Sequence, residues 1–466
     1  MIYRVVNFFR DFYKTYKDDV SLLLYIIVMA KFSMRWIDSV FGLVFFPLMI
    51  FIFLKFDIQK KMYLLIFLLP FAESQQLPRQ IFGIPGFNFV NFFFITVFIT
   101  MLVRRRGRFA HSDFNGPITI FVLLIFFSAV RGVDAMRLLG DTSYLSYYME
   151  SFLKPMEIFF CGIIAFNLFN KPEQPYHYFR IIRISSILFG LWVLHRGGGT
   201  TESMMRLSMV TGLHKNSIGF MFAVLLAMNM SMEDFGTMAE KALARVANIV
   251  YILVIMFTFS RQGYLSCIVI LMVYALRKGW KMTTIFLIGV ALFWNFFIPY
   301  EVKKRIYYGS EEGVVMGLKQ YTLGDTTAGR DEAWAAAAKP MKKYFLFGDG
   351  MNTYLKSIHP ARPDLPIHPH SAYIQSMLDM GIFGSVLFIG FYVFLMWKSW
   401  FLHKRSKSSF ARAYAFGFFL SIAIFMFQAY TGFRFYPNEE SYYIWLFLGG
   451  LMWVERNQKE LVAKGW

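Results

Sequence analysis

Apolar stretches recur along almost the whole chain, and they limit what it can fold into. A helix needs roughly 20 apolar residues to cross a hydrocarbon core about 30 Å thick. Two of the stretches, 20–30 and 62–72, are short enough to be half-buried or re-entrant, so we predict about 12–14 transmembrane helices. The apolar runs are 20–30, 36–54, 62–72, 86–102, 117–130, 155–169, 180–194, 216–230, 247–259, 263–276, 282–299, 372–397, 413–430 and 441–454.

Composition supports the same class of protein. Hydrophobic residues make up 57% of the 466 residues, whereas soluble domains are about 45–50% apolar. Cys161 and Cys267 both lie inside apolar runs, where we expect them to be inert packing residues. No Gly/Pro/Ser-rich linker or repeat divides the chain. We therefore predict an all-α polytopic membrane protein with a single transmembrane domain, 1–466, and no removable signal peptide.

The net charge is strongly positive, with 48 Lys and Arg against 29 Asp and Glu, giving +19. In a soluble protein this balance would favour nucleic acid as a partner. In a membrane protein it indicates cytoplasmic loops rich in Lys and Arg, or attraction to an anionic ligand or lipid headgroup. We therefore expect membrane lipids as partners and no nucleic acid.

The basic loops give a consistent orientation. If the cluster 104–108 is cytoplasmic, counting spans places both termini on that side together with the basic loops. These loops are 170–179, 231–246, 277–281 and 398–412. The opposite face then holds 131–154, 195–215, the turn near 261, 431–440 and one large outer loop, 300–371, in which we expect short helices.

Residues able to do chemistry gather on this outer face. The run 247–276 would form a helix of about 45 Å, too long for one span, and Ser260-Arg261-Gln262-Gly263 interrupts it. An arginine at the membrane edge is costly, so Arg261 is a candidate for function. The other candidates on this face are Arg206, His214, Lys215, Arg330, His359, His368, His370 and Arg434.

The outer residues favour one kind of chemistry over several others. His368 and His370 lie two apart across a proline, which is a poor zinc spacing even with His359 nearby. No phosphate-binding P-loop or nucleophile elbow occurs. Arginines bind phosphate and stabilise a departing diphosphate, while a neutral imidazole accepts a proton from an attacking hydroxyl. This set suits group transfer from a diphosphate lipid without a metal.

Four motifs resemble those of known families. His370-Ser371, then nine residues and Gly381-Ile-Phe-Gly384, resembles the His-[Asn/Ser/Gln]-x9-Gly-x-x-Gly signature of bacterial O-antigen ligases, although Asn is commoner than Ser. Arg261 to Leu265 resembles their Arg-x3-Leu motif. The segments 212–219 and 329–350 are similar to elements shared with the related polysaccharide polymerases. The resemblance covers roughly residues 200–390.

The resemblance implies a GT-C-like fold and a metal-independent, inverting glycosyltransferase of the bacterial inner membrane. The donor would be a glycan on undecaprenyl diphosphate, used at the periplasmic face without a cofactor. A ligase would transfer the glycan to a sugar hydroxyl of lipid A–core, and a polymerase to another lipid-linked repeat. By analogy Arg261 and Arg206 would bind the diphosphate, and His370 would activate the acceptor hydroxyl.

Further roles and alternatives remain open. His214, Lys215 and Arg330 are expected to contact the substrate, and Gly381 and Gly384 to allow close helix packing. Glu439-Glu440, beside Arg434, is an alternative base to His370. A different class of function is a lipid-linked oligosaccharide transporter. A transporter would place its ionisable residues near the midplane between repeated halves, whereas here they lie at one face under a long loop.

Overall fold

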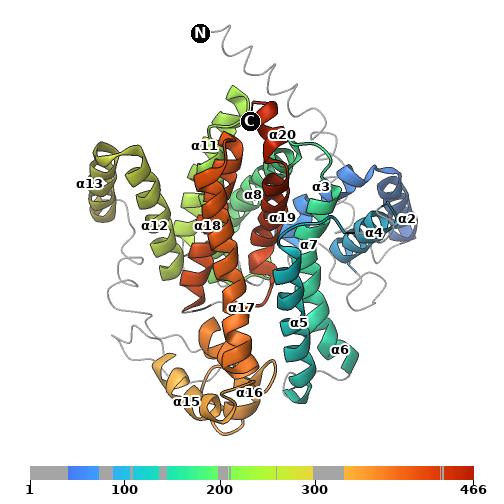
Figure 1. The fold of residues 1–466 in the computed structure, drawn as a ribbon, viewed down its shortest axis with the longest axis vertical. Coiled ribbons are helices and arrows are strands. Elements are labelled where there is room, and N and C mark those ends of the chain that lie inside the picture. Colours follow the sequence, from blue (N-terminus) through green and yellow to red (C-terminus); the bar gives the residue numbers. More distant parts are fainter. Residues whose placement is uncertain are drawn as a thin grey trace.

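The computed structural model describes residues 40–72, 88–104, 109–135, 144–197, 208, 211–258, 260–296, 330–430, 432 and 435–465. All regular structure in these residues is helical (Figure 1). The α-helices are α2 Val40–Lys55, α3 Ile58–Leu68, α4 Phe89–Arg104, α5 Asn115–Arg131, α6 Tyr144–Tyr148, α7 Lys154–Leu168, α8 Gln174–Gly197, α10 Lys215–Met232, α11 Met238–Phe257, α12 Arg261–Lys278, α13 Trp280–Phe296, α15 Arg330–Lys343, α16 Thr353–Ile358, α17 Ala372–Arg405, α18 Ser409–Ala429, α19 Tyr442–Arg456 and α20 Gln458–Ala463. Three short turns of other helix types are η1 Leu69–Phe71, η3 Met149–Leu153 and η4 Glu439–Ser441.

Membrane character is clear in this part of the chain. By length and composition four of its helical stretches are able to cross a membrane: Ser151–Leu168, Gln174–Arg196, Ala372–Arg405 and Ser409–Ala429. Two shorter apolar helices are Val90–Arg104 and Asn115–Arg131. The all-α membrane class is confirmed. The count of 12–14 spans stays a prediction, because several of the apolar runs fall partly or wholly outside the described residues.

Helix α10 lies at the centre of the bundle. It packs against α11, α12 and α18, and its side chains from Ser217 to Asn229 are all buried. Arg183 of α8, fully buried, donates from Nε to Oδ1 of Asn229 at 2.7 Å. A buried charge requires such partners, so this bond helps to fix α8 against α10.

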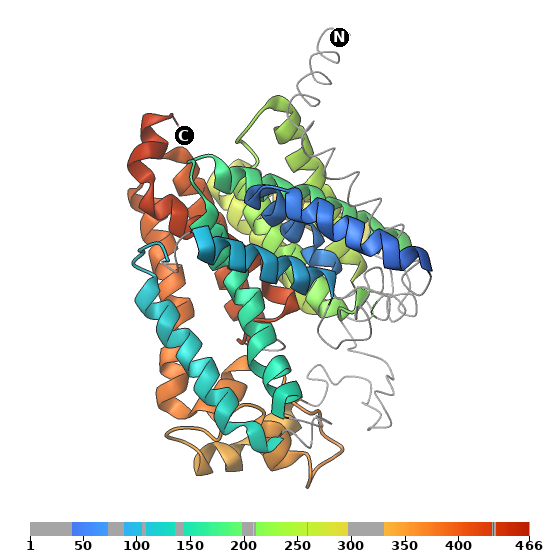
Figure 2. The ribbon, with the colours of Figure 1, turned by 90° about the vertical axis from the view of Figure 1, so that its right-hand side faces the viewer.

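The bundle has two chemically different ends. The α20 end holds α20 and the basic segments 231–246, 277–281 and 398–412, at the top of Figure 1. Three ion pairs at this end are Lys398–Glu455 at 2.8 Å, Lys278–Glu233 at 3.7 Å and Lys464–Glu173 at 3.7 Å. At the opposite end, α15 and α16 cover the ends of α5 and α17 (Figures 1 and 2). We call this the α16 end. The loops predicted to be cytoplasmic that the structure describes therefore share one end.

Helix α17 is broken near its start. Gly381 has φ 65° and ψ −172°, outside the helical region. The segment before the break packs on α15 and α16, through a small apolar core formed by Ala333, Ala337, Tyr354, Ile358, Leu365 and Leu378. Gly381 was expected to serve helix packing. That expectation is wrong, because its backbone lies against Leu346 and Phe347 of a turn, and a Cβ there would come within 2.3 Å of the Phe347 nitrogen.

Candidate functional site

The helix starts of α10 and α12 lie side by side at the α16 end. A Cβ added to Gly219 would be 3.7 Å from Cα of Gly263, and one added to Gly263 would be 3.6 Å from Cα of Gly219. Two glycines therefore let the first turns of these helices approach closely. The approach brings the His214-Lys215 pair close to the turn that begins at Arg261.

The predicted break before Arg261 is present and has a local cause. Helix α11 ends at Phe257, and α12 begins at Arg261. The Ser260 hydroxyl caps α12 by accepting from the Gly263 backbone N–H at 3.2 Å. A capping serine marks the start of a helix, and here it begins α12 directly before Arg261. Arg261 therefore lies in the first helical turn. Its side chain is half-buried.

Positive charge is concentrated where the two helices start. The backbone N–H groups of a first turn, with the helix dipole, favour anions. Lys215 is the first residue of α10, and His214 caps that helix, with its Nδ1 accepting from the Asn216 N–H at 3.2 Å. Arg261 is the first residue of α12. Two helix N-termini, each with a cationic residue in first place, therefore begin next to each other.

One of two neighbouring glutamates lies against the start of α10. The Ser217 hydroxyl, in the first turn of α10, donates to Oε1 of Glu440. Glu439 instead pairs with Lys154, with 2.6 Å between Nζ and Oε1. The two neighbouring glutamates thus point to different surroundings, and Glu440 is the one that lies against α10.

The C-terminal end of α18 connects α12 to the segment that carries His370. Gln428 donates to the Ser266 hydroxyl of α12 at 2.6 Å, and a Cβ on Gly432 would be 3.0 Å from the Gln262 amide. Between them, the ring of Tyr430 contacts that of Trp334, with centroids 5.5 Å apart. Gln428 and Gly432 therefore contact α12, while Tyr430 contacts α15.

Trp334 also holds the loop before α17. Its Nε1 donates to the backbone oxygen of Pro369 at 2.8 Å. The next residue, His370, has φ 52°, a left-handed conformation that is uncommon outside glycine but more frequent in histidine than in most residues. Such backbone outliers cluster at functional sites. The His368 and His370 ring centroids are 4.8 Å apart, and both side chains are half-buried.

The predicted site residues that the structure describes lie at the α16 end. Arg261, Lys215 and His214 belong to the adjacent starts of α10 and α12, and we refer to these three residues as the cluster. The loop of His370 is connected to the cluster by the contacts of Trp334, Tyr430 and Gly432. Arg330 begins the helix that contains Trp334. Arg206 and Arg434 lie outside the described residues. In the described part, no group of three or more His, Cys, Asp and Glu side chains is placed to hold a metal ion.

A buried aspartate organises the neighbouring part of this end. Asp379, 1% exposed, accepts hydrogen bonds from the Tyr436 hydroxyl at 3.0 Å, from the Gln375 amide at 2.8 Å and from the Thr353 backbone N–H at 3.2 Å. Burial and the nearby carboxylate of Asp379 raise the pKa of Tyr436 well above its usual range, so the phenol keeps the proton that it donates. Asp379 thus joins α17 to the segments that flank it.

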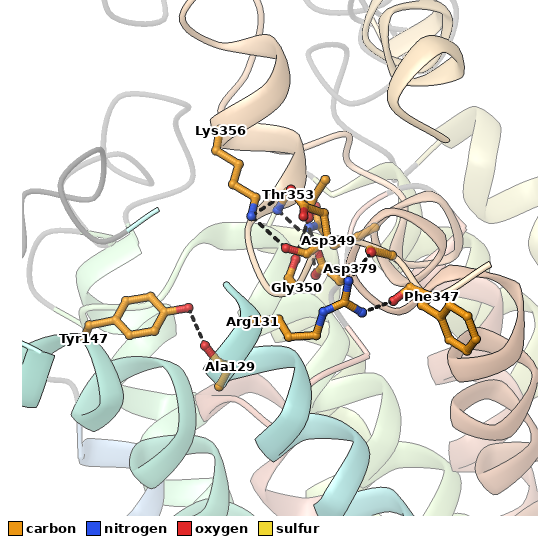
Figure 3. A network of polar contacts seen from close by, with 11 residues as sticks. Ala129, Arg131, Tyr147, Phe347, Asp349, Gly350, Thr353, Lys356 and Asp379 are labelled. Carbon is orange, nitrogen blue, oxygen red and sulfur yellow. Dashed lines mark hydrogen bonds and ion pairs between the residues drawn. The ribbon is translucent and has the colours of Figure 1, made fainter. Parts of the chain in front are cut away.

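The Gly348-Asp349-Gly350 turn docks onto this aspartate and onto α5 (Figure 3). The Gly350 N–H donates to the Asp379 backbone oxygen at 2.9 Å. The Arg131 guanidinium donates to the backbone oxygens of Phe347 and Gly348 at 2.5 and 2.7 Å. Both glycines have positive φ, 65° and 87°, which other residues rarely adopt. The motif is therefore a structural clamp between α5 and α17.

A polar cavity of about 240 Å³ opens beside the clamp. It is lined by Ser151, Lys154, Pro155, Ile158, Met351, Asn352, Gln375, Asp379, Tyr436, Pro437, Asn438 and Glu439. Asp379, Tyr436 and Lys154 are not among the site residues predicted from the sequence. The signal was present for Asp379, because a carboxylate in a long apolar run is costly and marks function by default.

A comparison with protein-family models matches residues 246–389 to the model described as O-Antigen ligase. The matched segment includes Arg261, Arg330 and His370, together with the glycine turn and Asp379. A comparison with curated proteins gave no match. The resemblance inferred from the motifs is thereby confirmed: residues 246–389 of this chain are similar to the O-antigen ligase family.

Proposed function

We propose that this protein is a membrane glycosyltransferase of the O-antigen ligase type. It transfers a glycan from undecaprenyl diphosphate to a sugar hydroxyl of lipid A–core, at the periplasmic face of the bacterial inner membrane. The observation that carries the proposal is the close approach of the α10 and α12 helix starts, which bear Lys215 and Arg261. Contacts of Tyr430 and Trp334 connect this region to the loop that bears His370.

The proposed mechanism uses the charges at the two helix starts. Arg261, with its planar fork of donors, binds the diphosphate of the donor, and Lys215 and His214 add further contacts. Arg330 and Arg206 are proposed as additional substrate contacts. As the bond between the sugar C1 and the diphosphate oxygen breaks, negative charge grows on the diphosphate. Cations and helix N-termini stabilise that charge in the transition state.

His370 supplies the base. The neutral imidazole takes the proton of the acceptor hydroxyl while that oxygen attacks C1 on the face opposite the diphosphate. One C–O bond forms and one breaks, so the anomeric configuration inverts. The proton rests on His370, and the diphosphate lipid leaves. No metal or cofactor is needed in this scheme, because the cationic side chains offset the leaving charge.

The test is transfer in vitro from a lipid-linked glycan with EDTA present. Arg261→Ala and His370→Ala are expected to remain folded and to lose transfer. Arg245→Ala and His111→Ala, which change exposed residues outside the cluster, are the matched controls and should stay active. Full activity in either site variant removes that residue from the mechanism. Loss of wild-type activity in EDTA would overturn the metal-independent scheme.

A polymerase that joins lipid-linked repeats is the second candidate, because the segments 212–219 and 329–350 are similar to polymerase elements. Deleting the protein and separating surface polysaccharide on a gel distinguishes the two. Loss of all lipid A–core-attached glycan, with lipid-linked polymer accumulating, indicates a ligase. A product of single repeats indicates a polymerase. Loss of surface polysaccharide with lipid-linked glycan held on the cytoplasmic side would instead favour a transporter.

A further inference from the structure

A second polar cavity lies at the α20 end, far along the bundle from the candidate site. It has a volume of about 530 Å³. It is lined by Met230, Ser231, Glu233, Asp234, Tyr274, Arg277, Lys278, His403, Lys404, Ser409, Arg412 and Ala413. Four cations and two carboxylates give the lining a net charge of +2 with His403 neutral. We call it the basic cavity.

Most of the cations in the basic cavity are not neutralised. Within the described residues, Lys278 pairs with Glu233 at 3.7 Å, while Arg277, Lys404 and Arg412 have no carboxylate within 4.0 Å. All three of these side chains are exposed. The cavity therefore presents open positive charge to an anion.

An apolar groove of about 570 Å³ lies on α17 and α18. It is lined by Val393, Met396, Trp397, Trp400, Phe419, Ala423 and Met426. Val393 and Trp397 are 51% and 56% exposed, so the groove is an open apolar surface on helices that are long enough to cross a membrane. Its surroundings suit hydrocarbon chains.

Aromatic rings join the groove to the basic cavity. Trp400, in the groove, contacts the ring of His403, in the cavity, with centroids 5.7 Å apart. The Phe416 ring centroid is 5.0 Å from that of His403, and the Arg277 guanidinium stacks over Phe416 at 3.9 Å. The Lys404 ammonium is 4.7 Å from the Trp400 ring centroid. Cation–π contacts of this kind hold charged groups at the border of an apolar surface.

The distance from the basic cavity to the far end of the groove matches one leaflet. From His403 to Val393 is ten residues of helix α17, about 15 Å at 1.5 Å per residue. That is about half of a hydrocarbon core 30 Å thick. The basic cavity therefore lies at headgroup depth when the groove lies at acyl-chain depth.

We propose that this composite surface binds one anionic membrane phospholipid of the leaflet at the α20 end. Its phosphate occupies the basic cavity beside Arg277 and Arg412, and its acyl chains lie in the groove beside Trp400 and Ala423. Basic pockets between transmembrane helices are recognised binding sites for anionic headgroups. The site is separate from the candidate active site, and it does not depend on the proposed reaction.

The test uses the purified full-length protein in detergent and native mass spectrometry of bound lipid. The probes are dioleoyl phosphatidylglycerol and dioleoyl phosphatidylcholine, which share acyl chains and differ in headgroup charge. The wild type is expected to retain phosphatidylglycerol over phosphatidylcholine. The double variant Arg277→Gln/Arg412→Gln should weaken phosphatidylglycerol binding by about 30-fold, since each cation near the surface is worth about fivefold.

Controls separate the headgroup from the chains. Arg245→Gln/Arg405→Gln removes the same charge from exposed residues outside the cavity and should retain the wild-type affinity. Ala423→Phe fills the groove without changing the charge and should weaken binding as well. Lys404→Gln, a single change at an exposed residue, is expected to cost about fivefold, and it keeps the test valid if the double variant does not fold.

Several results would overturn the proposal. Equal retention of the two phospholipids would show that headgroup charge does not drive binding. An equal loss of phosphatidylglycerol affinity in Arg277→Gln/Arg412→Gln and in its control Arg245→Gln/Arg405→Gln would show the same for the cavity. Displacement of phosphatidylglycerol by soluble glycerol phosphate at equal concentration would indicate a free-phosphate site without the groove. Preferential displacement by a polyprenyl diphosphate would identify the lipid carrier as the occupant instead.

Discussion

The break in α17 offers the sharpest structural test of the candidate site. Gly381, at φ 65° and ψ −172°, occupies a backbone region that is essentially restricted to glycine. Its backbone lies against the turn that precedes Gly348-Asp349-Gly350. Replacement of Gly381 by alanine should therefore release this turn from α17 while leaving the rest of the bundle folded.

The magnitude follows from two contributions. Forcing a residue with a Cβ into this conformation costs about 2 kcal/mol, and the Cβ would lie 2.3 Å from the Phe347 nitrogen and 2.4 Å from the Leu346 carbon. Relief of that clash breaks the bond from the Ile382 N–H to the Phe345 oxygen, 2.7 Å long, worth about 1 kcal/mol. The turn should therefore lose about 3 kcal/mol of local stability, which is about 100-fold in an equilibrium constant.

Amide hydrogen exchange followed by mass spectrometry measures this local opening. In Gly381→Ala, peptides covering residues 345–353 should exchange about 100-fold faster, while those from α18 should change little. The matched control is Gly390→Ala in the same helix, where a Cβ meets nothing within 4 Å; it should leave 345–353 unchanged. Exchange of 345–353 in Gly381→Ala within threefold of the wild type would refute the reasoning.

Three further outcomes are expected. Arg261→Lys should lower glycan transfer at least about tenfold, because an ammonium cannot make the bidentate contact with a diphosphate; steady-state rates near those of the wild type would count against that role. Asp379→Asn should destabilise the fold by about 2 kcal/mol, since hydrogen bonds to a charged group become neutral ones; thermal unfolding of the purified protein measures the loss, and an unchanged midpoint would contradict it. Trp334→Phe keeps an aromatic ring but removes the hydrogen bond to the Pro369 oxygen, so kcat should fall by a larger factor than the KM for the donor rises. A larger change in KM than in kcat would place Trp334 in donor binding.

Much of the architecture was predictable because it depends on local order along the chain. The apolar runs indicate helices at lipid-exposed or buried positions, and the helical class is confirmed. The interruption at Arg261 was also visible, because Ser260 and Gly263 supply a cap and a close approach within four residues. Motif spacing indicated the family without any tertiary information, and the family match confirms it.

The clamp was not predictable, because its partners are far apart in the chain. Asp379 binds Tyr436, 57 residues away, and Arg131 binds Phe347, 216 residues away. The glycine turn matches a family motif in the sequence. Its role in joining α5 to α17 is visible only in the structure, where its backbone lies against α17. Gly381 was interpreted as a helix-packing residue, since sequence alone does not reveal that φ is positive there.

The amino-acid sequence by itself therefore determined the helical membrane class, the grouping of basic loops and the residue types suited to a diphosphate. Those properties follow from side-chain chemistry and from the period of the helix. Only the tertiary structure decided that the starts of α10 and α12 share one region, that Tyr430 and Trp334 connect it to the loop of His370, and that Asp379 clamps the glycine turn. These arrangements depend on which helices pack together, and contacts between distant segments leave no regular pattern along a single chain.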